Sequence, residues 1–120
     1  MSEAEERVRQ IFDLEEWEAL PEVSEESLET YWAYLVEHLE FPFQAAYEAE
    51  EEPEGVPIQV TALLPVEQSP DDPEMFGLFC EAVQGRQTIQ VPLSVVEVTD
   101  PTSENYQLVE DYKEWFWSYR

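Results

Sequence analysis

The sequence predicts an α+β fold in one domain: a small bent antiparallel β-sheet, or a partly open barrel, flanked by N-terminal helices and a C-terminal helix. Two observations predict it. At both ends of the chain, over residues 1–40 and 105–119, apolar residues recur at three- and four-residue steps, which is the period of an amphipathic helix. Between them, residues 56–98 are rich in Val, Ile, Leu, Phe and Thr with partial alternation, which is typical of short strands. The 120 residues suit a single domain.

The first predicted helix forms an N-terminal arm within residues 1–20. Val8, Ile11 and Phe12 recur there at helical spacing, so they give the arm one apolar face. Pro21 then interrupts the pattern, because proline lacks the amide hydrogen that a continuing helix needs.

The second predicted helix covers residues 25–40. Ser24 precedes it and offers a hydroxyl oxygen that can accept a hydrogen bond from a free amide of the first turn. Pro42 ends the helix, because the residue before a proline avoids the helical conformation. Four apolar residues fall on one face of this helix: Leu28, Trp32, Leu35 and Leu39.

The middle of the chain, residues 56–98, predicts the sheet. It contains three segments rich in strand-forming residues, at 56–66, 75–84 and 87–98. Gly85 lies in a tight turn between the last two segments and predicts a hairpin. Proline cannot donate to a strand ladder, so prolines here belong at strand starts, edges or bulges and favour short, bent strands. These prolines are Pro57, Pro65 and Pro92.

A final helix is predicted over residues 105–119. Ser103 or Asn105 can cap its first turn. Its apolar stripe is formed by Leu108, Val109, Tyr112, Trp115, Phe116 and Tyr119. Aromatic residues of this kind, without basic neighbours, are more typical of a core than of a surface that stacks on nucleic-acid bases.

The charge restricts the partners that the chain can bind. It has 29 Asp and Glu against 5 Lys and Arg, for a formal net charge of −24. A nucleic-acid-binding protein needs a basic face, and an anionic membrane surface repels an acidic protein. We therefore expect no nucleic-acid or membrane partner. The expected partners of this monomer are cationic: metal ions or the basic surface of another protein.

The residues that most catalytic sites need are scarce. Cys80 is the single cysteine and His38 the single histidine, so neither a zinc site nor a Cys–His pair is predicted, and we expect no enzyme. Cys80 follows an apolar run and is expected to be a buried structural thiol. One cysteine suits a reducing compartment, and the first ten residues lack the basic and apolar regions of a signal peptide. A cytoplasmic location is therefore expected.

Carboxylates are the abundant chemical group, and Ca²⁺ is the cation that binds six to eight oxygens in flexible geometry. The candidate ligands are Glu37 and Glu40 at a predicted helix end, Asp71, Asp72 and Glu74 in a proline-bounded loop, and Glu110 and Asp111, which with Asp100 flank the final helix. An acidic run at residues 48–54 would raise the local cation concentration. None of these clusters has the spacing of an EF-hand loop, and each is also compatible with a solvated acidic face.

Three segments form a more specific combination. They read YLVEHLEFPF at 34–43 with Ala45, MFGL at 75–78 leading to VPL at 91–93, and NYQLVEDY at 105–112 with Trp115 and Phe116. Together they resemble the small acidic calcium-binding proteins of the cyanobacterial CcbP type, over about residues 28–117. The resemblance implies a cytosolic Ca²⁺-binding protein without EF-hands, in a family associated with Ca²⁺ buffering or sequestration during signalling and heterocyst development.

The resemblance also bears on the ligands. The FPF, VPL and NYQLV segments look like framework, and in the family an acid often follows FPF, where this chain has the neutral Gln44. The acids within the matching segments become candidate Ca²⁺ ligands by this resemblance: Glu37, Glu40, Glu74, Glu110 and Asp111.

The sequence thus leads to two hypotheses. The first is a Ca²⁺ buffer or sensor whose affinity is micromolar or weaker, with a dissociation constant on the order of 10⁻⁶–10⁻⁴ M. The alternative is an acidic interaction protein, such as a DNA mimic, that occupies the basic surface of another protein. The second hypothesis predicts no response to Ca²⁺ beyond that to ionic strength.

Overall fold

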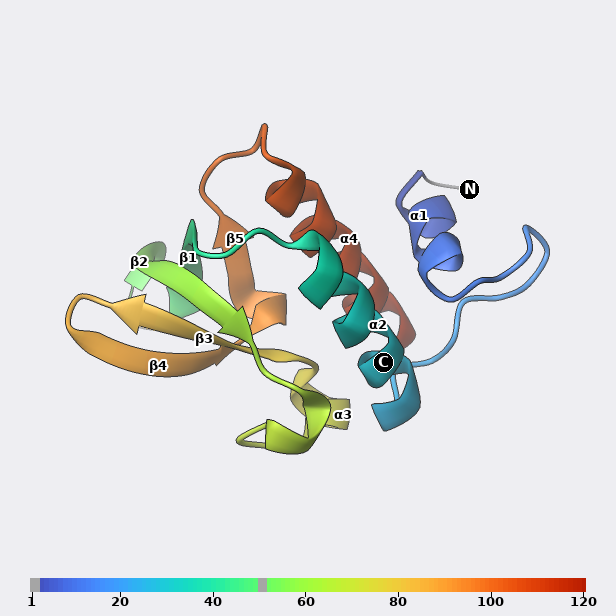
Figure 1. Ribbon diagram of the computed structural model, residues 1–120, viewed down its shortest axis with the longest axis horizontal. Coiled ribbons are helices and arrows are strands. Elements are labelled where there is room, and N and C mark those ends of the chain that lie inside the picture. Colours follow the sequence, from blue (N-terminus) through green and yellow to red (C-terminus); the bar gives the residue numbers. More distant parts are fainter. Residues whose placement is uncertain (1–2, 50–51) are drawn as a thin grey trace.

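The structure, a computed structural model, describes residues 3–49 and 52–120 (Figure 1). The helices are α1 Glu3–Ile11, α2 Glu25–His38, α3 Pro73–Phe76 and α4 Glu104–Tyr119. The strands are β1 Phe43–Ala49, β2 Glu52–Leu63, β3 Phe79–Gln84, β4 Gln87–Pro92 and β5 Val96–Val98. Two short 3₁₀ helices, η1 Val66–Gln68 and η2 Leu93–Val95, complete the elements.

The five strands form one open antiparallel sheet in the order β4-β3-β2-β1-β5. The long strand β2 joins its two halves, because its first part pairs with β1 and its last part with β3. Pro57 lies where β2 pairs with β1 alone, so its missing amide hydrogen removes no bond to β3. The predicted α+β fold with a bent antiparallel sheet is confirmed, and the sheet does not close into a barrel.

The helices lie beside this sheet. Figure 1 shows α2 and α4 next to each other, with α1 packed on α4 on the side away from the strands. α4 contacts β5 and η2, whereas α2 contacts η1 and α3. No helix among the described residues is long and apolar enough to span a membrane.

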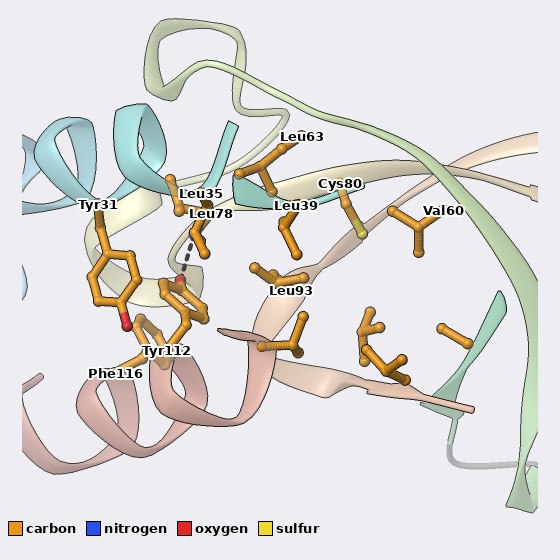
Figure 2. Close-up of a cluster of buried hydrophobic side chains, with 14 of the residues drawn as sticks. Tyr31, Leu35, Leu39, Val60, Leu63, Leu78, Cys80, Leu93, Tyr112 and Phe116 are labelled. Atoms are coloured by element: carbon orange, nitrogen blue, oxygen red, sulfur yellow. Dashed lines mark hydrogen bonds between the residues drawn. The ribbon is translucent and has the colours of Figure 1, made fainter. Parts of the chain in front are cut away.

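Aromatic side chains fill the space between α2 and α4. Tyr31 of α2 and Tyr112, Trp115 and Phe116 of α4 are all buried, and the rings of Tyr31 and Tyr112 meet edge to face with centroids 5.2 Å apart (Figure 2). The ring nitrogens of two tryptophans reach other elements: Trp115 donates to the carbonyl of Pro21 at 3.0 Å, and Trp32 donates to that of Leu63 at 3.1 Å. A buried indole N–H needs such an acceptor.

The backbone between α3 and β3 passes directly over α4. The Tyr112 hydroxyl accepts a hydrogen bond from the amide of Leu78 at 2.8 Å (Figure 2), and the Leu78 carbonyl accepts one from the amide of Leu93. Gly77 precedes this contact with φ 75° and ψ −154°, a region that is essentially restricted to glycine. A Cβ atom there would also collide with the Tyr112 hydroxyl and lie 2.8 Å from Cε1 of Phe116.

Within the described part of the helical arm predicted over residues 1–20, the helix covers Glu3–Ile11 and ends there. Asp13, at φ 55°, ends α1 in the left-handed conformation. The amide of Leu14 bonds the carbonyl of Arg9 and that of Asp13 bonds the carbonyl of Gln10, which is the Schellman arrangement. The sequence did not predict this helix end, because glycine is the usual residue in the left-handed position after a helix and this chain has Asp13 there.

Strand β1 was not predicted, since Phe43–Ala49 is composed mostly of Gln, Ala and Glu, residues with low strand preference. It forms a strand because it lies between two partners: Ala45 faces Ile58 of β2 on one side and Val98 of β5 on the other. The predicted segment 87–98 is divided into β4 and β5 by η2, which starts directly after Pro92. Likewise, the segment 75–84 begins with the end of α3.

We expect Gly77→Ala to lower the free energy of unfolding by about 3 kcal/mol, because it combines a strained backbone with a collision against α4. Gly85→Ala is the matched control. Gly85 also has a positive φ, 61°, but no atom lies within 4 Å of its Cβ position, so the expected loss is only about 1–2 kcal/mol. Urea unfolding measures both values, and equal losses would contradict the close contact with α4.

Candidate functional site

Glu37 and Glu40 lie at the end of α2. This helix ends at His38 rather than at residue 40, and the Leu39 amide makes its last helical bond, 2.7 Å to the carbonyl of Leu35. Glu37 is therefore on the last helical turn, whereas Glu40 lies in the extended segment that follows. Both residues are exposed. The predicted helix over residues 25–40 would carry both acids, but α2 ends before Glu40, so the two carboxylates do not share one helical face.

The backbone of Glu40 is fixed by Asn105, a buried residue in the first turn of α4. The Asn105 side-chain oxygen accepts a hydrogen bond from the Glu40 amide at 3.0 Å, and its nitrogen donates to the Glu40 carbonyl at 2.9 Å. This reciprocal pair holds the chain after α2 against the start of α4. Ser103 caps α4 by accepting from the amide of Tyr106, so the helix end that presents Asn105 is itself well defined.

Asp71, Asp72 and Glu74 share one exposed loop before β3. Asp72 caps α3, since its Oδ1 accepts from the Glu74 amide at 3.0 Å. The Oδ1 of Asp71 accepts from the Asp72 amide at 2.8 Å. Each aspartate thus uses one carboxylate oxygen to shape this exposed loop.

Glu110 and Asp111 on α4 both have basic partners. Glu110 lies 3.6 Å from the Lys113 ammonium group. Asp111 is buried, and its two oxygens accept from Nε and a terminal nitrogen of Arg7 at 2.6 Å and 2.9 Å. The hydrogen bond to Asp111 raises the pKa of Arg7. Asp100 is exposed and accepts from the amide and hydroxyl of Thr102, which lowers the pKa of Asp100.

These acids do not form a ready-made ion cage. Within residues 3–49 and 52–120, no three Asp, Glu, His or Cys side chains are grouped so that they can hold a metal ion. Of the acidic run at 48–54, Glu48 and Glu54 are exposed, whereas Glu50 and Glu51 lie outside the described residues. The donor chemistry still fits Ca²⁺, since carboxylate and carbonyl oxygens are its preferred ligands and it tolerates irregular geometry.

Two residues outside the predicted ligand set, Arg7 and Asn105, organise the surroundings of these acids. Arg7 carries a weak signal, because it is one of only two basic residues among the first 54, where 18 are acidic. Such an isolated base indicates a specific acidic partner. The sequence named Asn105 only as a possible helix cap, a role that Ser103 fills, and nothing in the sequence indicates its bonds to Glu40.

Cys80 is buried in β3, as the sequence predicted, and its thiol donates to the carbonyl of Val91. Burial raises the pKa of this thiol to about 12. The thiol is therefore protonated at neutral pH and unsuited to act as a nucleophile. His38 is exposed, and its ring stacks on Tyr34 with centroids 4.0 Å apart while Nδ1 donates to the Tyr34 carbonyl.

Comparison with known proteins places these features in a family context. A family model described as calcium binding, Calci_bind_CcbP, matches residues 21–116. The fold is similar to the crystal structure of Anabaena CcbP, with a TM-score of 0.63 and 21% identity, covering 98% of this chain and 89% of that one. It is also similar to a calcium-binding protein solved in its calcium-binding form, with a TM-score of 0.68, 20% identity, and coverage of 100% and 99%. A comparison with curated proteins gave no match.

We expect Asn105→Ala to lower the free energy of unfolding by about 2 kcal/mol, because the amide and carbonyl of Glu40 both lose their partner. Gln87→Ala, at an exposed position of β4, is the control and should change it by less than about 0.5 kcal/mol. Urea unfolding measures both, and an unchanged stability in Asn105→Ala would show that the Asn105–Glu40 contact contributes nothing.

We also expect stability to fall as the pH rises above about 9. The Cys80 pKa is 9.0 when the thiol is ordinary and about 12 in the folded chain, so between these values the unfolded state binds fewer protons. Each such group lowers the free energy of unfolding by up to about 1.4 kcal/mol per pH unit in this range. Buried Tyr31 and Tyr112, whose pKa values burial also raises, act in the same direction at higher pH. In urea unfolding between about pH 8 and pH 10, Cys80→Ala should show a shallower decline than the parent, and parallel declines would contradict the argument.

Proposed function

The chain belongs to the calcium-binding CcbP family, and on this basis we propose that it binds Ca²⁺ through exposed carboxylates to buffer or sense the ion in the cytoplasm. The observation that carries the proposal is the extent of the family match, residues 21–116, which includes every acid predicted as a ligand. The proposed role is one of binding, without catalysis and without an EF-hand.

The acids at the end of α2 and in the loop before β3 are the proposed primary ligands. Their carboxylates are exposed, and in the described part of the chain none of them forms an ion pair. A cation therefore displaces no basic side chain when it binds them. These primary ligands are Glu37, Glu40, Asp71, Asp72 and Glu74. Glu110 and Asp111 remain candidates, but each must first give up a basic partner.

The expected affinity for Ca²⁺ follows from the exposure of these carboxylates. Side chains that are not held in a cage keep part of their hydration and lose conformational entropy when an ion gathers them. A dissociation constant on the order of 10⁻⁶–10⁻⁴ M is the expected range for such a site. Mg²⁺ should compete poorly, because it requires a small octahedral arrangement and sheds water reluctantly. The net charge of −24 adds a general attraction for cations that salt can screen.

Calorimetric titration of chelator-treated protein with CaCl₂, in about 0.15 M NaCl to screen general attraction, tests the proposal. We expect saturable binding with a defined stoichiometry and little heat from MgCl₂. The double variants Glu37→Gln/Glu40→Gln and Asp71→Asn/Asp72→Asn should each lose a site or bind about tenfold more weakly. The matched control Glu29→Gln/Glu97→Gln removes the same charge at exposed positions outside both clusters and should bind as the parent does.

A thermal measurement provides a second readout. Ca²⁺ at about one hundred times its dissociation constant should stabilise the folded state by about 2.7 kcal/mol, because it binds only that state. A titration without saturation, together with a melting temperature that NaCl of equal ionic strength shifts equally, would refute Ca²⁺ binding. The acidic interaction protein would then be the hypothesis to test with a basic partner.

A further inference from the structure

The guanidinium group of Arg7 lies among oxygens from two helices. Besides both oxygens of Asp111, it contacts the side chain of Gln107 on α4, which, oriented with its oxygen toward Arg7, accepts hydrogen bonds at 2.7 Å and 2.9 Å. An oxygen of Glu3, one turn earlier on α1, is 3.9 Å away. A cation of the chain itself thus occupies an oxygen-lined position on α4.

This contact docks α1 on α4 together with the buried Val8 and the partly buried Ile11. The helix has nine residues, too few to be stable alone, and Val8 is its one buried residue. The first turn of α1 is acidic, and α4 is acidic as well, so the two helices repel each other. Arg7 is the side chain of α1 that bonds directly to a carboxylate of α4. Neutralisation of Asp111 by Arg7 therefore offsets this repulsion.

A buried hydroxyl group beside this pair has no partner. Tyr31 is fully buried, and among the described residues its hydroxyl makes no hydrogen bond. It lines a groove of about 280 Å³ between α1, α2 and α4, together with Arg7, Gln107 and Asp111. Burial and then the nearby Asp111 charge raise the Tyr31 pKa, so the hydroxyl remains protonated. An unpartnered buried hydroxyl is costly, and a rearrangement that frees the Asp111 carboxylate offers it an acceptor.

We propose that Arg7 is a tethered cation that competes with Ca²⁺ for the Asp111 carboxylate, so that Ca²⁺ binding there and docking of α1 on α4 exclude each other. The inference rests on the proposed function. Arg7 uses both oxygens of Asp111, and Ca²⁺ needs at least one of them, so the two cations cannot be bound in these positions together. Departure of Arg7 leaves the oxygens of Asp111 and Gln107 facing the groove next to the Tyr31 hydroxyl.

This competition gives the protein two states, which a sensor requires. With α1 docked, the Asp111 site is closed, and with α1 released, it is open to Ca²⁺. The apparent affinity of such a site is its intrinsic affinity multiplied by the fraction of molecules in the open state. A helix docked in about nine molecules of ten therefore weakens Ca²⁺ binding at Asp111 about tenfold.

The first test compares Arg7→Gln with Arg86→Gln by calorimetric titration with CaCl₂. Both variants change the net charge from −24 to −25, since each removes one of the five basic side chains, but Arg86 is exposed at the turn between β3 and β4, outside the groove. We expect Arg7→Gln to bind one Ca²⁺ about tenfold more tightly than the parent, and Arg86→Gln to bind as the parent does.

The second test measures α1 directly by hydrogen exchange of its backbone amides. In the parent protein, Ca²⁺ should speed exchange across Glu3–Ile11, and MgCl₂ at equal ionic strength should not. In Asp111→Asn these amides should exchange fast with or without Ca²⁺, because the variant lacks the partner of Arg7.

The outcomes separate this inference from the proposed function. If the parent binds Ca²⁺ but Arg7→Gln behaves like Arg86→Gln and α1 exchange does not increase, the competition is refuted while Ca²⁺ binding stands. If neither the parent nor any variant binds Ca²⁺, both are refuted. Tighter binding by Arg7→Gln together with Ca²⁺-dependent release of α1 establishes the competition.

Discussion

The close approach of Gly77 to α4 is the constraint on which the rest of the structure depends. At this point the chain leaves α3, passes over the Tyr112 and Phe116 rings and enters the sheet, and only a residue without a side chain fits. The next residue, Leu78, bonds Tyr112 through its amide and Leu93 through its carbonyl. One buried crossing therefore connects α4, the start of β3 and the start of η2.

This crossing explains how a strongly acidic chain keeps its candidate ligands in place. Because Tyr112 and Phe116 fix α4 against the sheet, the residues on the other faces of the same helix acquire defined positions. Asn105 in its first turn can then hold the backbone of Glu40, and Asp111 in its middle can hold Arg7. The core is apolar and aromatic, so repulsion among the carboxylates acts mainly at the surface, where water and salt screen it.

The parts that the sequence predicts well are those where a local pattern and a tertiary requirement coincide. The helical stripe of α4 and the Ser24 cap of α2 are of this kind, since periodicity and capping chemistry are local. Strand β1 was missed because its Ala, Gln and Glu residues become a strand only between β2 and β5. The candidate acids were found by type, but the Arg7–Asp111 pair joins residues 104 positions apart, and no local pattern encodes such a contact.

If the proposed competition holds, the distinction between a buffer and a sensor depends on α1 rather than on the exposed acids. Ions bound by the solvent-facing carboxylates of the loop before β3 neutralise charge without displacing any element, which is how a buffer behaves. Asp111 differs, because its oxygens are already bound to a cation that belongs to a helix. Under the proposed competition, an ion that takes this carboxylate displaces the helix as well, since Arg7 is part of α1. If Ca²⁺ binds both sets of acids as proposed, the chain buffers through one set and signals through the other, and the affinity of Asp111 relative to the exposed acids decides which occurs first as Ca²⁺ rises.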